Sequence, residues 1–273
     1  MKTLDEKSVI AALKQKIGID KIDKNGYYIS SNPKDNLLEE FPNWKDVRDE
    51  LNEGAGNELT SKFCAVHSSS ALCVNNFTPF KENFKKVDFL GYSDFSEAIF
   101  EKKQPTGLIG TPPHLDFYLE NNNTIIGFES KFTEYFTQKL PNHDKNLEKY
   151  YNNNILSGYL PNGFNNEIIK YHICYPNKMH LDVAQLIKHT IGLLKNKNGK
   201  KAILVYIYWQ PENWKDFDIC KEHKKEIEEF ACKIKCFIDF RAFSYLDFWE
   251  CYKKNDLFKK HIFNVEERYK FSL

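Results

Sequence analysis

The stretch HLDFYLENNNTIIGFESK, residues 114–131, decides the fold of this chain. Its first part is rich in aromatic and branched residues that favour strands, three asparagines follow, and the strand pattern resumes at Thr124. Asparagines between two apolar runs are typical of a tight turn. The stretch therefore predicts a β-hairpin, with strands over residues 115–119 and 124–128.

Three ionisable side chains gather at one end of this predicted hairpin. Side chains alternate across a strand, so Glu129 and Lys131 share one face while Ser130 points to the other. If Asp116 lies on that face too, two carboxylates and an ammonium group converge. Mg²⁺ prefers one or two carboxylates completed by water and phosphate oxygens, and it activates water for phosphodiester hydrolysis. The alternative is a solvated ion pair between the strands, with a small effect on stability.

The segments around the hairpin predict a sheet flanked by helices. Residues 95–102 are interpreted as a helix that carries Glu97 and Glu101. Residues 181–189 begin an amphipathic helix that places Gln185 and His189 one turn apart on the same face. Residues 202–209 form a nearly continuous apolar run, which is typical of a strand buried on both faces. The apolar stripe of the second helix consists of Val183, Leu186, Ile187, Ile191 and Leu194.

On these motifs, HLD followed by ESK and then the QLIKH helix, the chain resembles the PD-(D/E)xK nuclease superfamily, and more narrowly a bacterial restriction-endonuclease-like family. The resemblance covers roughly residues 58–210. It implies an α/β fold, with a restriction-endonuclease-like core of mixed β-sheet flanked by helices and with added helical segments. The chain departs from the usual motif at Leu115, where the superfamily has proline directly before the aspartate; that proline is structural.

The resemblance also implies roles for individual residues. Glu101, Asp116 and Glu129 would bind the metal, Lys131 would assist the attacking water, and Gln185 would complete the site. Glu97 lies one predicted turn before Glu101 and is the alternative to it. Glu134 is expected close to the site or on the surface. Lys188 and His189 are expected at the surface, with contact to a phosphate as the alternative.

The implied function is a Mg²⁺-dependent endonuclease of double-stranded DNA, with Mn²⁺ as a substitute ion, of the restriction type and acting as a homodimer. Three alternatives stay open: a DNA-repair nuclease, a non-catalytic nucleic-acid-binding protein of the same fold, and a zinc-stabilised interaction protein built around the C-terminal cysteines. The net charge is +1, so no global basic field marks a purely electrostatic DNA binder.

Length and hydropathy agree with a chain that works inside the cell. With 273 residues and 41% hydrophobic content it can bury a substantial core. No apolar run approaches the roughly 20 residues that span a bilayer, and the first residues lack the apolar core of a signal peptide, so we expect a cytoplasmic protein without membrane contact. The expected organisation is an N-terminal helical cap (1–57), a nuclease core (58–210) and a C-terminal α/β extension that closes the same domain (211–273).

The seven cysteines are expected to be free thiols. Cys220, His223, Cys232 and Cys236 have a spacing that could chelate zinc, but helical packing explains the spacing equally well. The other cysteines, Cys64, Cys73, Cys174 and Cys251, are expected in the core.

An insertion rich in asparagine and tyrosine, near residues 139–170, follows the predicted hairpin. Its aromatic side chains could stack on nucleic-acid bases, and an ordinary solvated loop is the alternative. The candidates for stacking are Tyr150, Tyr151, Tyr159 and Phe164.

Overall fold

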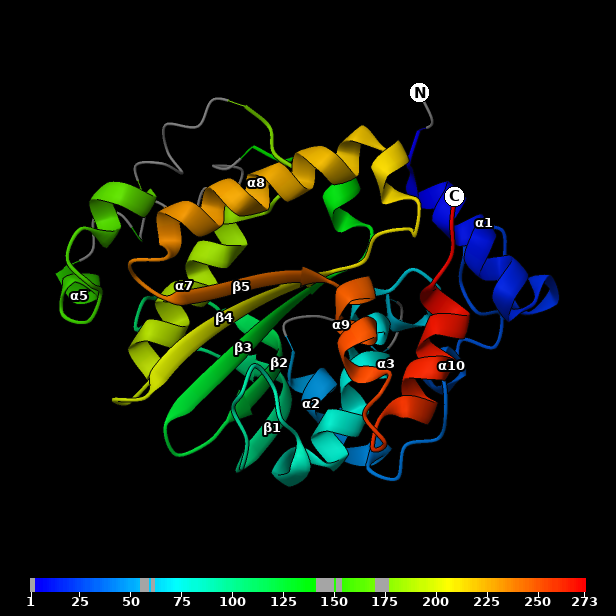
Figure 1. Cartoon of the computed structure of the whole chain (residues 1–273), viewed down its shortest axis with the longest axis horizontal. Coiled ribbons are helices and arrows are strands. Elements are labelled where there is room, and N and C mark those ends of the chain that lie inside the picture. The colour runs from blue at the N-terminus through cyan, green and yellow to red at the C-terminus, as the bar shows by residue number, and fades with distance from the viewer. Residues whose placement is uncertain (1–2, 55–58, 60–61, 141–149, 151–153, 170–176) are drawn as a thin grey trace.

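A five-stranded mixed sheet forms the centre of the computed structural model, which describes residues 3–54, 59, 62–140, 150, 154–169 and 177–273 (Figure 1). The strand order is β1-β2-β3-β4-β5; β2 is antiparallel to both β1 and β3, while β3, β4 and β5 run parallel. This architecture confirms the predicted α/β class. The strands are β1 (Glu97–Lys103), β2 (His114–Glu120), β3 (Thr124–Lys131), β4 (Lys201–Tyr208) and β5 (Asp239–Ser244).

The predicted hairpin is β2 and β3. The Asn121 side chain accepts hydrogen bonds from the backbone N–H groups of Asn123 and Thr124, at 2.9 and 2.8 Å, and this closes the turn. Phe117 pairs with Phe128, and every residue of β3 from Thr124 to Ser130 is buried. The apolar run of β4 is buried as predicted, because helices cover both faces of the sheet at this strand.

The prediction of a helix over residues 95–102 is wrong, because this stretch contains β1. Ala98 and Phe100 point into the core and pair with β2 in an antiparallel ladder. Glu97 and Glu101 are four residues apart, a spacing that puts two side chains on one face of a helix or of a strand alike. The sequence pattern alone could not separate the two structures; the pairing with β2 decides for the strand.

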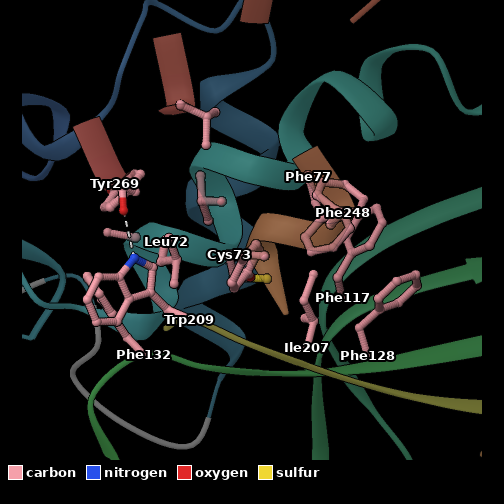
Figure 2. Packing of buried hydrophobic residues seen from close by; sticks show 14 of the residues in the cluster. Leu72, Cys73, Phe77, Phe117, Phe128, Phe132, Ile207, Trp209, Phe248 and Tyr269 are labelled. Atoms are coloured by element: carbon pink, nitrogen blue, oxygen red, sulfur yellow. Dashed lines mark hydrogen bonds between the residues drawn. The ribbon is translucent and has the colours of Figure 1, made fainter. Parts of the chain in front are cut away.

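One face of the sheet is covered by helices from both ends of the chain (Figure 1). Aromatic rings fill this layer: Phe77 stacks on Phe117 with ring centroids 4.8 Å apart, and the indole N–H of Trp209 donates to the Tyr269 carbonyl at 2.7 Å (Figure 2). The helices of this layer are α1 (Glu6–Ile17), α2 (Trp44–Glu53), α3 (Ser69–Glu82), α9 (Tyr245–Tyr252) and α10 (Lys259–Tyr269).

The opposite face is covered by α7 (Val183–Asn196), α8 (Asp218–Ile234) and the segment around α5 (Asn154–Ser157). All five apolar positions predicted for α7 are buried. Short helical turns connect the larger elements: η1 (Ile19–Lys21), η2 (Pro33–Asn36), η3 (Lys62–Cys64), η4 (Phe84–Lys86), η5 (Glu134–Phe136), η7 (Asn165–Ile169) and η8 (Trp214–Asp216).

The base-stacking hypothesis for the insertion fails at two of its four residues. Tyr150 and Phe164 are buried in the core on the α7 face, so their rings are not available to bases. Tyr159 is partly buried, and its hydroxyl donates to the Thr106 carbonyl at 2.7 Å. Tyr151 lies outside the described residues.

The structure contradicts the zinc hypothesis. Cys220 and His223 are buried on α8, and the His223 Nε2 lies 2.9 Å from the Tyr206 hydroxyl; Cys232 and Cys236 are exposed. Helical packing therefore explains their spacing. Cys64 and Cys73 are buried as predicted, Cys251 is exposed instead, and Cys174 lies outside the described residues.

Among the helices that can be described, none combines the length and apolar character needed to cross a bilayer.

Candidate active site

Three acidic residues line up across neighbouring strands: Glu101 on β1, Asp116 on β2 and Glu129 on β3. The β1–β2 pairs on either side, at Phe100 and Lys102, place Glu101 opposite Asp116. Continuing the β2–β3 register past Phe117 and Phe128 places Asp116 opposite Glu129. The sheet therefore sets these carboxylates in one row.

This row lies where the sheet opens. Pairing between β2 and β3 stops at Phe117 and Phe128, although β2 stays paired with β1, and β3 with β4, beyond that point. The Asp116 carboxylate enters the gap and accepts a hydrogen bond from the Ser130 backbone N–H at 2.6 Å. Ser130 itself points to the other face, where its hydroxyl lies 2.7 Å from that of Tyr245, as the alternation of β3 predicts.

A cleft of about 1170 Å³ opens over the row and brings loops and helices to it. Glu101 and Asp116 line the cleft, and Glu129 is only 1% exposed beneath it. Other residues lining the cleft include Lys62, His114, Lys131, Glu134, Gln185, Lys188 and His189.

Burial and charge repulsion act together on Asp116. Loss of solvent raises the pKa of its carboxyl well above the ordinary value of 3.8, and the neighbouring charges of Glu129 and Glu101 raise it further. Lys131 and the hydrogen bond from the Ser130 N–H lower the pKa of Asp116, but by less than burial and the neighbouring carboxylates raise it. A cation between these carboxylates would remove the repulsion, so the donor set fits a hard divalent ion.

The Glu129 carboxylate lies between a lysine and a histidine. Its Oε1 lies 2.5 Å from Lys131 Nζ and its Oε2 lies 2.7 Å from His189 Nε2. Burial alone would raise the pKa of Glu129, but Lys131 and His189 bring it below 4.5. Glu129 is therefore ionised at neutral pH.

Lys131 is fixed from several sides. Its Nζ donates to Gln185 Oε1 at 2.9 Å in addition to its pair with Glu129. Burial lowers the pKa of the ammonium group, but Glu129, Glu134 and Asp116 raise it above its ordinary value. Lys131 therefore acts as a charged hydrogen-bond donor and not as a neutral base.

Gln185 reaches Lys131 from the first turn of α7. Asp182 is the N-cap of this helix and accepts a hydrogen bond from the Gln185 backbone N–H at 3.1 Å. Burial works against the charge of Asp182, but Lys139 at 3.0 Å and the other donors lower its pKa to about 2.

Glu101 and not Glu97 accompanies Asp116. The Glu101 side chain is 12% exposed and its Oε2 lies 3.6 Å from His114 Nδ1. Its backbone has a φ of 52°, which is uncommon for a residue other than glycine. Glu97 lies at the start of β1, where it pairs with Lys102 at 2.8 Å.

The side chains do not form a closed metal cage. In the described ranges, no three histidine, cysteine or acidic side chains come close enough together to hold an ion. Mg²⁺ is commonly held by one or two protein carboxylates with water and phosphate oxygens, so an open site of this kind fits it.

Comparison with known protein families identifies one match. The family described as Restriction Endonuclease associating with ARP matches residues 9–270. The chain belongs to this family. The match confirms the restriction-endonuclease-like resemblance read from the HLD and ESK motifs and extends it far beyond residues 58–210. Comparisons with curated proteins and with solved structures find no match.

The sequence reasoning missed the position of His189. It was expected at the surface, but it is 1% exposed and contacts Glu129. Its spacing from Gln185 could have predicted this position, because the two polar residues lie one helical turn apart and therefore face the same side of α7. Glu134, left open between site and surface, lines the cleft and accepts a hydrogen bond from the Phe132 N–H at 2.7 Å.

Proposed function

We propose that this protein is a Mg²⁺-dependent endonuclease that hydrolyses phosphodiester bonds in double-stranded DNA. The observation that carries the proposal is the row of Glu101, Asp116 and Glu129 at the opening of the sheet, with the Lys131 ammonium beside it. Family membership supports it, since a restriction-endonuclease family points to nuclease chemistry.

In this proposal Asp116 and Glu101 would hold the ion from the cleft side together with water and phosphate oxygens, and the Glu129 side chain would have to move closer to them to become a third ligand. When bound, the ion polarises the scissile phosphate, lowers the pKa of a bound water and neutralises developing negative charge. Mn²⁺, which accepts the same oxygen ligands, would substitute.

Lys131 orients the attacking water and stabilises the charge that develops on the phosphorus oxygens. Its geometry suits this role because Glu129 and Gln185 fix the ammonium group while it still lines the cleft. A group held in place before the reaction loses little reorganisation energy when charge develops. His189 positions Glu129 through its contact with Oε2.

Cutting both strands of a duplex requires two such sites, so we propose a homodimer that acts on DNA in the cytoplasm. Lys62 and Lys188 line the cleft with Lys131 and supply cationic side chains for the phosphate backbone. Sedimentation of the protein with duplex DNA tests the stoichiometry; a complex with one protein chain would contradict the dimer.

Incubation of supercoiled plasmid with purified protein and Mg²⁺ tests the activity. We expect cleavage by the wild type, none in EDTA, and none by Asp116→Asn or Glu101→Gln. Glu97→Gln is the matched control, because Glu97 lies on the same strand but pairs with Lys102 away from the row; it should cleave normally.

The products separate the alternatives. Cuts at one fixed sequence indicate restriction-type specificity, and scattered nicks indicate a repair nuclease. If the wild type binds duplex DNA in a gel-shift assay but cleaves none with Mg²⁺ or Mn²⁺, the endonuclease proposal is wrong and the non-catalytic alternative holds.

A further inference from the structure

The loop QPTGLIGTPP, residues 104–113, joins β1 to β2 and carries an exposed isoleucine at the edge of the cleft. Ile109 is 95% exposed, the highest value for any large hydrophobic side chain in the part of the chain that the structure describes. Single exposed apolar residues are common on protein surfaces. This one is unusual because it lines the same cleft as Asp116 and Lys131.

The base of the loop is anchored to the neighbouring elements. The Gln104 N–H donates to the Pro113 carbonyl at 2.8 Å, and Asn196 of α7 donates to the Pro105 carbonyl at 3.0 Å. The Tyr159 hydroxyl donates to the Thr106 carbonyl at 2.7 Å. These bonds hold the loop on the α7 side of the sheet, so the position of its tip is set before any ligand binds.

The loop turns sharply on either side of its apolar tip. Gly107 and Gly110 have φ values of 82° and 117°, a region that side chains with a Cβ rarely adopt. Pro112 and Pro113 stiffen the return to β2. Two glycines and two prolines therefore shape the backbone on either side of Leu108 and Ile109. Leu108 packs against the core. Only Ile109 projects from this frame as a large apolar group.

We propose that Ile109 is a wedge that contacts the base stack of the bound duplex beside the scissile phosphate. This inference rests on the proposed function, because a phosphate held by a divalent ion at Asp116 would bring the adjacent base pairs to the cleft wall formed by the loop. Apolar side chains such as isoleucine insert between base steps from the minor groove, unstack them and kink the duplex. Pyrimidine–purine steps unstack most easily, so the wedge favours such a step at a fixed distance from the cut.

The test uses duplexes with 2-aminopurine, whose fluorescence rises on unstacking, placed at successive steps along the DNA that the protein protects in a footprint. The variants are Ile109→Ser, Ile109→Leu and the control Ile19→Ser, all in the full-length protein and with Ca²⁺, which also takes oxygen ligands, in place of Mg²⁺. Ile19 is also exposed, at 68%, but does not line the cleft. Ile109→Ser removes no buried contact of the folded chain, so its melting temperature should equal that of the wild type.

We expect a fluorescence rise at one step with the wild type, with Ile109→Leu and with Ile19→Ser, and none with Ile109→Ser. Burial of one isoleucine side chain corresponds to roughly tenfold in affinity, so Ile109→Ser should bind DNA about tenfold more weakly. A duplex with a mismatch at that step should reduce the difference in affinity between the wild type and Ile109→Ser, because the mismatched bases are already partly unstacked.

The outcomes separate the wedge from the nuclease activity. If the wild type cleaves plasmid but Ile109→Ser matches it in affinity and fluorescence, the wedge is overturned and the endonuclease stands. If the wild type binds and unstacks DNA through Ile109 without cleaving it, the wedge stands and the endonuclease fails. If the wild type neither binds nor cleaves DNA, both are overturned.

Discussion

Asp116→Asn should stabilise the metal-free protein at neutral pH. Burial and the charges of Glu129 and Glu101 raise the pKa of Asp116 in the folded state, whereas the unfolded chain has the ordinary value of 3.8. Above pH 3.8 the unfolded state releases this proton more readily than the folded state does. The folded state therefore loses stability as the pH rises from 3.8 to the folded-state pKa. Asparagine carries no charge and removes this loss.

The size of the gain follows from what the substitution keeps and removes. An asparagine side-chain oxygen can still accept the hydrogen bond from the Ser130 N–H, now at 2.6 Å, so the packing of the gap between β2 and β3 is retained. The favourable attraction to Lys131 is lost, which reduces the gain. We expect about 1–2 kcal/mol, the usual scale for relieving a strained functional residue.

Thermal unfolding in EDTA at pH 7 measures this gain, which should raise the melting temperature by about 2–4 °C per kcal/mol for a chain of this size class. The gain should vanish near pH 3.8, where Asp116 is increasingly protonated in both states. Added Mg²⁺ should stabilise the wild type and not the variant, because the ion binds only a folded site with its ligands. An Asp116→Asn protein less stable than the wild type in EDTA at pH 7, or a gain unchanged at acid pH, would refute the reasoning.

Three further substitutions probe the same site. Lys131→Met should abolish cleavage and destabilise the fold by about 3 kcal/mol in urea titrations, because it removes the ammonium group that is paired with the buried Glu129 carboxylate. The pKa of Glu129 is held below 4.5 in the folded state, so its ion pairs stabilise the protein above that pH, and this stabilisation is lost as the pH falls through the folded-state pKa. Equal urea midpoints for the wild type and Lys131→Met at pH 7 would count against this pairing. His189→Ala should cost about 1–3 kcal/mol by the same measurement, while Lys225→Ala at an exposed position of α8 should cost little, and a reversed order would remove His189 from the site. Gly54→Ala should weaken Mg²⁺ binding in isothermal titration, because the new methyl group would lie 3.2 Å from Glu101 Oε2 and 3.0 Å from the Leu51 carbonyl; unchanged Mg²⁺ affinity would show that Glu101 is not a ligand.

The hairpin could be predicted from the sequence because its signals are local. Three asparagines mark the turn, and the alternation along residues 115–119 and 124–131 fixes which side chains share a face. That alternation also predicts the convergence of Glu129 and Lys131. The strand β1 could not be predicted, because the spacing of its two glutamates is compatible with a helix or a strand. Only the pairing with β2 distinguishes these two structures.

The position of His189 could not be predicted for a different reason. Its contact with Glu129 joins residues 60 positions apart in the chain, and it exists only because α7 packs across β3 and β4. A single helical pattern shows which residues share a face, but not what that face meets. The cysteines on α8 and just after it illustrate the same limit: the spacing suggested chelation, but Cys220 is buried by packing while Cys232 and Cys236 are exposed.

The opening between β2 and β3 explains why the carboxylates can be both buried and reactive. Glu101 and Asp116 belong to strands that remain paired with each other, and Glu129 and Lys131 belong to a strand that remains paired with β4. A cation held by carboxylates on both sides would bridge the gap that the missing β2–β3 pairs leave. The Ser130 N–H is satisfied by Asp116 in place of a strand partner, so the sheet opens without leaving this donor unpaired. The missing β2–β3 pairs open the sheet under the cleft. They therefore also set the distance between Glu101 and Asp116 on one side and Glu129 on the other.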